Sequence, residues 1–254
     1  MESPWGWADS AQALLETDAD DIESALVGQS NRLGIGASSS QVVAWRESIA
    51  LLRSALGAID EPTLASWSVI FEYELPLEGG RRPDVVILAG GSVVVLEFKQ
   101  DDKATQAALD QVGAYARDLA DYHGGTAGRP VAPVLVLTQT ETINADFDPV
   151  LVCGAAELTS SLRELGSPGA IDLKAWLASD YEPLPTLVAA ARRVFREEPL
   201  HHVRTALSSG IPATLQHIAA IADSAERNSE RHLVLLDGVP GSGKTLVGLR
   251  LIYE

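Results

Sequence analysis

Residues 82–99 read RPDVVILAGGSVVVLEFK, and this stretch decides the fold. Its two apolar runs, 85–89 and 92–96, are rich in valine and isoleucine, which favour β-strands over helices. Between them lies the pair Gly90-Gly91, and glycine tolerates the positive φ that a tight hairpin turn requires. The stretch therefore predicts a β-hairpin with a two-residue turn.

The register of this hairpin brings charged side chains together at its open end. If the two glycines form the turn, Ala89 pairs with Ser92, and Asp84 lies directly opposite Glu97. Side chains opposite each other on one face are about 5 Å apart, so two carboxylates there destabilise the sheet. Lys99, two residues beyond Glu97, projects from the same face. A divalent cation between the carboxylates explains the arrangement, and an ordinary charge pair at a strand end is the alternative.

Length and composition limit the class of protein. The chain of 254 residues is long enough for one domain and part of another. Its net charge of −16 gives no support to broad binding of nucleic acid, so such contacts need a local basic patch. The single cysteine, Cys153, excludes an internal disulfide and predicts a cytoplasmic location. No secretory signal and no apolar run of about 18 residues is present, so no membrane partner is expected.

The spacing of apolar residues predicts the elements around the hairpin. Helices are expected over 7–16, 19–28, 41–58 with Ser40 as N-cap, 104–122 and 156–165, and strands over 66–75, 131–138 and 150–153. This order predicts an α/β fold with one mixed central sheet flanked by helices. The turn-rich sequences at 166–169 (GSPG) and 182–185 (EPLP) predict a boundary, and helices near 184–197 and 212–227 lead to an apolar strand over 232–237. The predicted domains are a helical extension over 1–38, a core domain over 39–180, a connector over 181–210 and a second domain over 211–254.

Residues 238–245 read GVPGSGKT and match the phosphate-binding loop G-x-x-x-x-G-K-S/T. The loop follows an apolar strand and opens an apolar helical segment, which is the context that the motif requires. Backbone N–H groups of such a loop hold the phosphates of ATP, Lys244 reaches the β- and γ-phosphates, and Thr245 ligates Mg²⁺. A glycine-rich turn that matches by chance is the alternative. The expected nucleotide-binding residues are Gly238, Pro240, Gly241, Ser242, Gly243, Lys244 and Thr245.

The chain ends nine residues after Thr245, and no further strand ending in acidic residues follows. We therefore expect these residues to be the N-terminal part of a longer protein. The segment from 211 onward would be the first strand, loop and helix of a RecA-like ATPase domain. By itself it is expected to hydrolyse ATP poorly or not at all.

Two motifs together resemble a known nuclease superfamily. Arg82-Pro83-Asp84, followed thirteen residues after Asp84 by Glu97-Phe98-Lys99, resembles the PD-(D/E)XK pattern. The sequence QVGAY, residues 111–115, resembles the Q-x-x-x-Y motif of the branch found in recombination-type nucleases. The resemblance covers about residues 40–155 and implies a restriction-endonuclease-like fold. With GVPGSGKT, the chain also resembles prokaryotic proteins in which such a nuclease domain precedes a schlafen-like, superfamily 1-type helicase domain.

The resemblance implies a metal site. Asp84, Glu97 and the backbone carbonyl of Phe98 would hold one or two Mg²⁺ or Mn²⁺ ions. Family members often place a carboxylate on the first core helix, which implies Glu47 as a further ligand. A solvated charge on the helix is the alternative for Glu47.

The resemblance also implies roles for other polar residues. Lys99 would orient the attacking water or neutralise charge in the transition state. Gln111 and Tyr115 would position the phosphate backbone or the metal-bound groups, and the alternative for Gln111 is that it bonds a backbone group. The expected phosphate contacts are Arg81, Arg82, Lys103 and Arg117.

The function expected from these features is Mg²⁺-dependent phosphodiester hydrolysis. The resemblance favours DNA over RNA as substrate, and it implies coupling to an ATP-driven helicase or translocase, with a role in phage defence or DNA repair. Two alternatives stay open. The first is a catalytically inactive nuclease fold that loads a motor onto nucleic acid, and the second is a P-loop regulatory ATPase with a protein-interaction domain.

Overall fold

The computed structural model describes residues 3–76, 80–140, 143–183, 211–237, 244, 247–248 and 251. It divides into two compact units, Met1–Tyr181 and Glu182–Glu254. The hairpin and all the helices and strands that surround it belong to the first unit. The predicted connector over 181–210 lies almost wholly outside the described residues.

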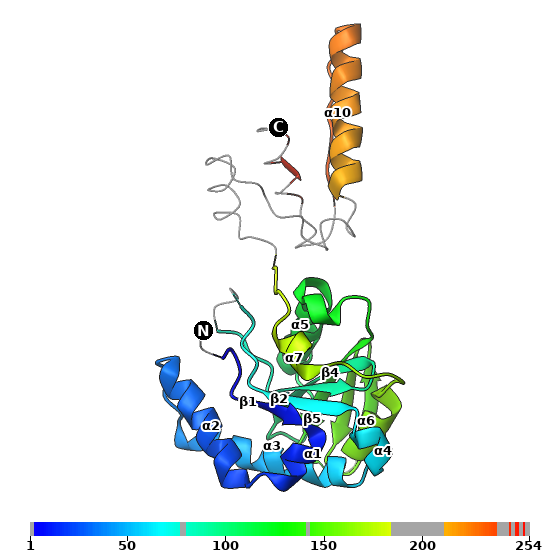
Figure 1. The fold of residues 1–254 in the computed structure, drawn as a ribbon. Helices are drawn as coiled ribbons and strands as arrows, with labels where there is room; N and C mark the ends of the chain where they lie inside the picture. Colours follow the sequence, from blue (N-terminus) through cyan, green and yellow to red (C-terminus); the bar gives the residue numbers. More distant parts are fainter. Residues whose placement is uncertain are drawn as a thin grey trace. The chain divides into compact units, whose positions relative to one another are not determined.

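A mixed sheet of seven described strands forms the centre of the first unit, and helices lie on both of its faces (Figure 1). The strands are β1 (Trp7–Ser10), β2 (Trp67–Phe71), β3 (Val85–Ala89), β4 (Ser92–Lys99), β5 (Val131–Leu137), β6 (Asn144–Phe147) and β7 (Val150–Gly154). Their order is β1-β2-β3-β4-β5-β7-β6. The pairs from β1 to β4 are antiparallel, β5 is parallel to β4 and β7, and β6 is antiparallel to β7. The prediction of an α/β fold with a mixed, helix-flanked sheet is confirmed.

The five helices predicted for the first unit are present with shifted ends, and three short helical segments, over 61–64, 124–126 and 173–177, were not predicted. They are α1 (Ala11–Glu16), α2 (Ala19–Arg32), α3 (Ser39–Gly57), α4 (Glu61–Leu64), α5 (Gln106–Tyr122), α6 (Leu158–Leu165) and α7 (Leu173–Leu177), with a 3-10 turn, η1 (Gly124–Thr126). Within the described ranges, no helix is long and apolar enough to cross a membrane.

The hairpin of β3 and β4 has the predicted register. Ala89 pairs with Ser92, and the ladder continues to the last pair before Asp84 and Glu97. Gly90 takes a φ of 67°, and a Cβ on this residue would overlap the carbonyl oxygen of Ser167. The turn thus packs against the segment GSPG. This segment lies inside the first unit, and the division between the two units, after Tyr181, falls at the other turn-rich segment, 182–185.

Both faces of the sheet are buried, because successive side chains of a strand enter two different cores. On β3, Val85 and Ile87 pack with α1, α2, α3 and α6 in the first core. Val86 and Leu88 pack with α5 and α7 in the second core. A strand that is covered on both faces reads as a continuous apolar run, which explains the composition of the hairpin.

The N-terminal segment differs from its prediction. Residues Trp7–Ser10 form the edge strand β1, paired with β2, where the first turns of a helix were predicted. The helix begins only at Ala11, because the Ser10 hydroxyl caps it by accepting a hydrogen bond from the Ala13 N–H. Segment 1–38 therefore contributes an edge strand to the sheet and two helices to the first unit, and it is not a separate helical extension. Similarly, Ser38 rather than Ser40 caps α3.

Strand β2 ends four residues earlier than predicted, at Phe71. Glu72, the next residue, has a φ of 52°, in the left-handed region that residues other than glycine rarely adopt. This conformation changes the face on which the following residues lie, since Phe71 is in the first core and Tyr73 in the second. Glu72 is buried, although in the strand predicted over 66–75 it stands between apolar residues as a solvent-facing residue would.

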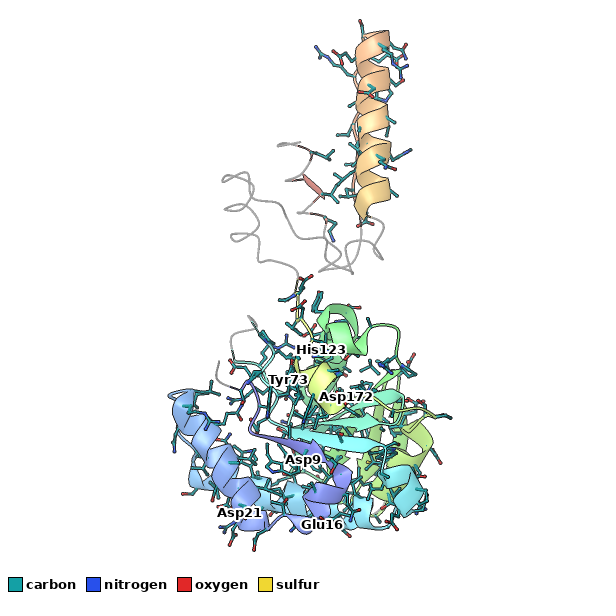
Figure 2. All side chains as sticks on the ribbon, viewed as in Figure 1. Asp9, Glu16, Asp21, Tyr73, His123 and Asp172 are labelled. Carbon is teal, nitrogen blue, oxygen red and sulfur yellow. The ribbon has the colours of Figure 1, made fainter. Side chains whose placement is uncertain are left out.

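Aromatic packing anchors the chain that follows Glu72. Figure 2 shows Tyr73 and His123 next to each other near α7. His123 stacks on Trp176 with ring centroids 3.9 Å apart, and the centroid of Tyr73 is 5.1 Å from that of Trp176. Burial lowers the pKa of His123 to about 4, so the ring is neutral at pH 7. This cluster has a packing role.

The strands after α5 include one that was not predicted. The ranges predicted over 131–138 and 150–153 correspond to β5 and β7. Strand β6 was missed because it is short and polar (NADF) and gains its order from pairing with β7.

In the second unit, α10 (Ile211–Asn228) confirms the helix predicted over 212–227. The strand predicted over 232–237 is absent from the described residues of this unit, and Leu233 and Leu235 are 85% and 84% exposed. A strand is stable only when it pairs with another, and the apolar pattern cannot supply the partner. The helix predicted near 184–197 lies outside the described residues.

The contact between Gly90 and Ser167 can be tested by two alanine substitutions. Gly36 has nearly the same φ, 70°, but no described atom lies within 4 Å of the position of its Cβ. Gly36→Ala should lower the free energy of unfolding by about 1–2 kcal/mol, the cost of the left-handed conformation. Gly90→Ala should lower it by roughly 2 kcal/mol more, since backbone must also move. Urea unfolding followed by tryptophan fluorescence measures both, and equal losses would contradict the packing.

Candidate active site

Asp84 lies at the open end of the hairpin, just before β3. Its Oδ2 accepts a hydrogen bond from the Phe98 N–H at 2.8 Å, and its backbone carbonyl accepts one from the Glu72 N–H at 3.0 Å. The backbone ladder between β3 and β4 ends at Val85 and Leu96. The Asp84 carboxylate therefore takes the place of the next backbone acceptor that the β3 side would offer to β4, and this bond fixes its position.

Glu97 and Lys99 continue the face of β4 that α5 covers. The Lys99 Nζ donates to the Glu97 Oε1 at 2.8 Å. Glu97 is only 2% exposed, and its Oε2 is buried without a hydrogen-bond partner among the described residues. Leaving a buried charged oxygen unsatisfied is costly. This oxygen is thus suited to a ligand that the chain itself does not supply.

The Phe98 backbone carbonyl faces the same end of the hairpin. The Lys99 carbonyl accepts a hydrogen bond from the Thr138 N–H at 2.9 Å, on the β5 side. Backbone groups alternate between the two edges of a strand, so the Phe98 carbonyl points to the β3 side, where the Phe98 N–H meets Asp84. Two carboxylates and a carbonyl therefore lie at one point of the sheet.

These oxygens fit Mg²⁺, which is commonly held by one or two carboxylates and completes its shell with water and phosphate. Three or more His, Cys, Asp or Glu side chains do not come together as a metal-binding group anywhere in the described part of the chain. The fit therefore rests on Asp84 and on the unsatisfied oxygen of Glu97. Glu47, predicted as a further ligand, accepts a hydrogen bond from the Gln100 Nε2 at 2.6 Å, so its role as a ligand stays a prediction.

Burial and charge shift the pKa values of the three groups. The pKa of Asp84 is raised well above its usual range by burial and then by the charge of Glu97. The pKa of Glu97 is raised by burial, although Lys99 acts in the opposite direction. Burial lowers the pKa of Lys99, but its hydrogen bond to Glu97 and the charges of Glu97 and Asp84 outweigh this and raise it. A second cation would stabilise both ionised carboxylates.

Gln111 and Tyr115 lie on one face of α5, as predicted. The Gln111 Nε2 donates to the Tyr115 hydroxyl at 3.2 Å, so this amide bonds a side chain rather than a backbone group. Tyr115 also contributes to the raised pKa of Lys99, which places its phenol near the ammonium group. The structure thus brings both residues of the Q-x-x-x-Y pattern to the same end of the sheet as the carboxylates.

Two of the arginines predicted to contact phosphate form ion pairs within the protein. The Arg81 Nη1 lies 2.7 Å from the Asp118 Oδ2, and its guanidinium carbon lies 5.2 Å from the centroid of the Tyr115 ring. The Arg82 Nε lies 3.1 Å from the Glu72 Oε2. Both side chains are therefore held against buried carboxylates.

Glu72 is a site residue that sequence reasoning missed. Its Oε1 accepts a hydrogen bond from the Trp45 Nε1–H at 2.8 Å. Burial raises the pKa of Glu72, and its negative charge contributes to the raised pKa values of Asp84 and Glu97. In the sequence, Glu72 interrupts an apolar run in the way that a solvent-facing residue does, so only its left-handed backbone reveals its place.

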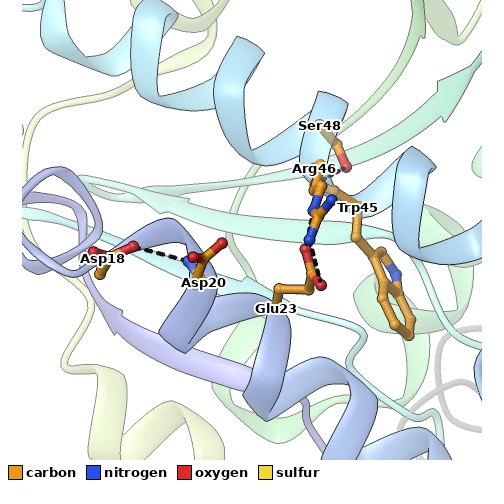
Figure 3. Close-up of polar contacts among 6 residues, drawn as sticks. All are labelled: Asp18, Asp20, Glu23, Trp45, Arg46 and Ser48. Carbon is orange, nitrogen blue, oxygen red and sulfur yellow. Dashed lines mark hydrogen bonds and ion pairs between the residues drawn. The ribbon is translucent and has the colours of Figure 1, made fainter.

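The position of Trp45 depends on how α3 packs. Arg46, the next residue, forms an ion pair with Glu23 of α2. Figure 3 shows that the two side chains diverge as they leave α3, with Arg46 reaching Glu23 and the Trp45 ring turned away from it. One side chain thus ties α3 to α2 while the other reaches Glu72.

The other two predicted phosphate contacts lie apart from these groups. Lys103 is exposed in the loop between β4 and α5. Arg117 is on the opposite side of α5 from Tyr115 and borders a groove of about 870 Å³ between α5 and the β6–β7 turn. Asp110 and Asp148 line the same groove, so its charge does not favour phosphate.

The predicted phosphate-binding loop lies largely outside the described residues. Lys244 is described and has helical conformation, whereas 238–243 and Thr245 are not described. The geometry of the loop therefore stays a prediction.

No family model matches this sequence, and no curated protein or solved structure is significantly similar to it. Any role for the site rests on its own geometry and on the motifs.

The raised pKa of Asp84 predicts a specific effect of removing its charge. The stability that this group contributes is present below its unfolded pKa of about 3.9, and it is lost as pH rises through the higher folded pKa. In metal-free buffer at pH 8, Asp84→Asn should therefore raise the melting temperature, by about 2–4 °C for each kcal/mol released. At a pH of about 3.5 the difference should largely disappear.

In Mg²⁺ the wild type should have a higher melting temperature than Asp84→Asn, because the ion should stabilise the wild type and not the variant. Differential scanning calorimetry with and without Mg²⁺ measures both effects. Asp110→Asn, which changes an exposed carboxylate of α5, is the matched control and should leave the melting temperature nearly unchanged. A lower melting temperature for Asp84→Asn in metal-free buffer at pH 8 would contradict the account.

Proposed function

We propose that the first unit is a Mg²⁺-dependent nuclease with a restriction-endonuclease-like fold. The observation that carries this proposal is the pairing of Asp84 with Glu97 at one end of the sheet, with a Glu97 oxygen that no other described group satisfies. Two facing carboxylates with an unsatisfied oxygen are unfavourable without a cation, and they suit a metal ion that also binds phosphate. The PD-(D/E)XK resemblance supports the same reaction, phosphodiester hydrolysis.

Asp84, Glu97 and the Phe98 carbonyl would hold Mg²⁺ or Mn²⁺. When bound, the metal lowers the pKa of a coordinated water and offsets the charge that develops on the scissile phosphate. The hydrogen bond from the Phe98 N–H holds the Asp84 carboxylate in one orientation before any ligand arrives. This reduces the reorganisation that binding requires.

Lys99 supplies a positive charge beside the carboxylates. Its ammonium donates to the Glu97 Oε1 and so carries its proton, which suits it to offset negative charge on a phosphoryl group rather than to remove a proton. The Gln111 amide and the Tyr115 hydroxyl add hydrogen-bond donors on the α5 side. We infer that these donors orient the phosphate backbone next to the carboxylates.

DNA is the proposed substrate, on the basis of the resemblance. The net charge of −16 works against non-specific binding of a polyanion, so the site needs substrate to be delivered. The motif at 238–245 supports an ATP-driven helicase or translocase as the delivering domain. The same resemblance suggests a role in phage defence or DNA repair.

Cleavage assays test the proposed function. Wild type is incubated with labelled single-stranded DNA, double-stranded DNA and RNA, in Mg²⁺, Mn²⁺ or EDTA. We expect DNA cleavage that needs the metal and that falls about 100-fold or more in Glu97→Gln and Lys99→Ala, because the first weakens metal binding and the second removes the positive charge beside the reacting phosphate. Asp110→Asn, the exposed control on α5, should cleave at the wild-type rate.

Cleavage that is equal in wild type and both site variants would contradict the proposed function. Absence of cleavage by the wild type with every substrate and metal would also contradict it. DNA binding without cleavage would then favour a catalytically inactive nuclease fold.

A further inference from the structure

The two consecutive arginines before Asp84 bind to opposite sides of the sheet. Arg82 pairs with Glu72, whose other carboxylate oxygen is held by Trp45 in the first core. Arg81 pairs with Asp118 of α5 and lies over the Tyr115 ring in the second core. The segment that leads into β3 is therefore tied to the helices on both faces.

Backbone hydrogen bonds join the same segment to the end of β2. The Glu72 N–H donates to the Asp84 carbonyl at 3.0 Å, and the Leu75 N–H donates to the Arg81 carbonyl at 2.9 Å. The Glu72 carbonyl in turn accepts from the Gln29 Nε2 at 3.1 Å. Glu72 adopts its left-handed conformation at the centre of these bonds, and such backbone strain persists only where the surroundings fix it.

We propose that Arg81 and Arg82 form a two-sided arginine clamp that positions Asp84, with Asp118 and Glu72 as its anchors. The clamp holds residues 80–84 so that the Asp84 carboxylate stays opposite Glu97 despite their repulsion. The four clamp residues are positioning residues, because none of them touches the reacting groups. Their effect on catalysis rests on the proposed nuclease function, whereas their effect on the segment does not.

The clamp assigns both arginines a different role from the phosphate contact that the sequence predicted. The side chain of Arg82 is 13% exposed and that of Glu72 is 9% exposed, so this guanidinium faces the protein. Arg81 is more exposed, but its guanidinium already meets the Asp118 carboxylate and the Tyr115 ring. A phosphate would have to displace these groups.

Amide hydrogen exchange measured by NMR tests the clamp without reference to activity. In Asp118→Asn, we expect exchange at the Leu75 amide to be about tenfold faster, because this amide donates to the Arg81 carbonyl. In Arg82→Met, exchange at the Glu72 amide should rise similarly. Amides in the middle of β4 should keep their wild-type rates in both variants. Asp118→Glu, which retains the charge, should keep most of the protection.

Arg129→Met is the matched control. Arg129 is exposed, donates to the Gly125 carbonyl four residues earlier, and is far in sequence from residues 72–84. It should leave both amides unchanged. If neither Asp118→Asn nor Arg82→Met alters exchange at its amide, the clamp is overturned, whatever the protein does to DNA.

Steady-state cleavage kinetics test the positioning role. A displaced Asp84 lowers kcat, so we expect kcat to fall about tenfold in both variants while KM and its salt dependence stay the same. If the arginine contacted phosphate, its loss would instead raise KM and reduce the slope of log KM against log salt by about 1. That result, or an unchanged kcat with faster exchange, would overturn the positioning role. If the wild type cleaved no DNA, the proposed function would be refuted. The amide exchange rates at Leu75 and Glu72 would still show whether the clamp exists.

Discussion

The repulsion between Asp84 and Glu97 is the constraint on which the rest of the site depends. The hairpin register puts these carboxylates opposite each other, and the strands cannot shift because both of their faces are buried in apolar cores. A slip by one residue would carry Glu97 to the other face of the sheet and displace Gly90-Gly91 from the turn, so it is disfavoured. The chain partly offsets the repulsion with Lys99 and the Phe98 N–H. It does not remove the repulsion, which adds to burial in raising the pKa of Asp84, whereas the pKa of Glu97 is raised chiefly by burial.

The sheet carries this unfavourable pair because helices on its two faces supply the surrounding polar groups. From one face, α3 presents Trp45 to Glu72, and from the other, α5 presents Tyr115 and its hydrogen-bonded Gln111. Glu72, although paired with Arg82, adds negative charge near Asp84 and Glu97 and contributes to their raised pKa values. An arrangement that keeps negative charge close together, partly buried, is typical of a site that is completed by a cation.

The parts of this site that local sequence determines could be predicted, and the parts set by tertiary contacts could not. Gly90-Gly91 fixed the hairpin register and hence the pairing of Asp84 with Glu97, and helical spacing placed Gln111 beside Tyr115. The role of Glu72 depends on one left-handed residue, which leaves no trace in the alternation of apolar side chains. The ion pairs of Arg81 and Arg82, and the edge strand β1, likewise depend on partners far away in the chain.

The most direct test of the account is anomalous diffraction from crystals of this chain soaked in millimolar Mn²⁺. We expect an anomalous peak between the carboxylates of Asp84 and Glu97, within coordination distance of the Glu97 Oε2, and loss of this peak in Asp84→Asn. A map without a peak there would contradict it, especially if Glu97 remained bound only to Lys99.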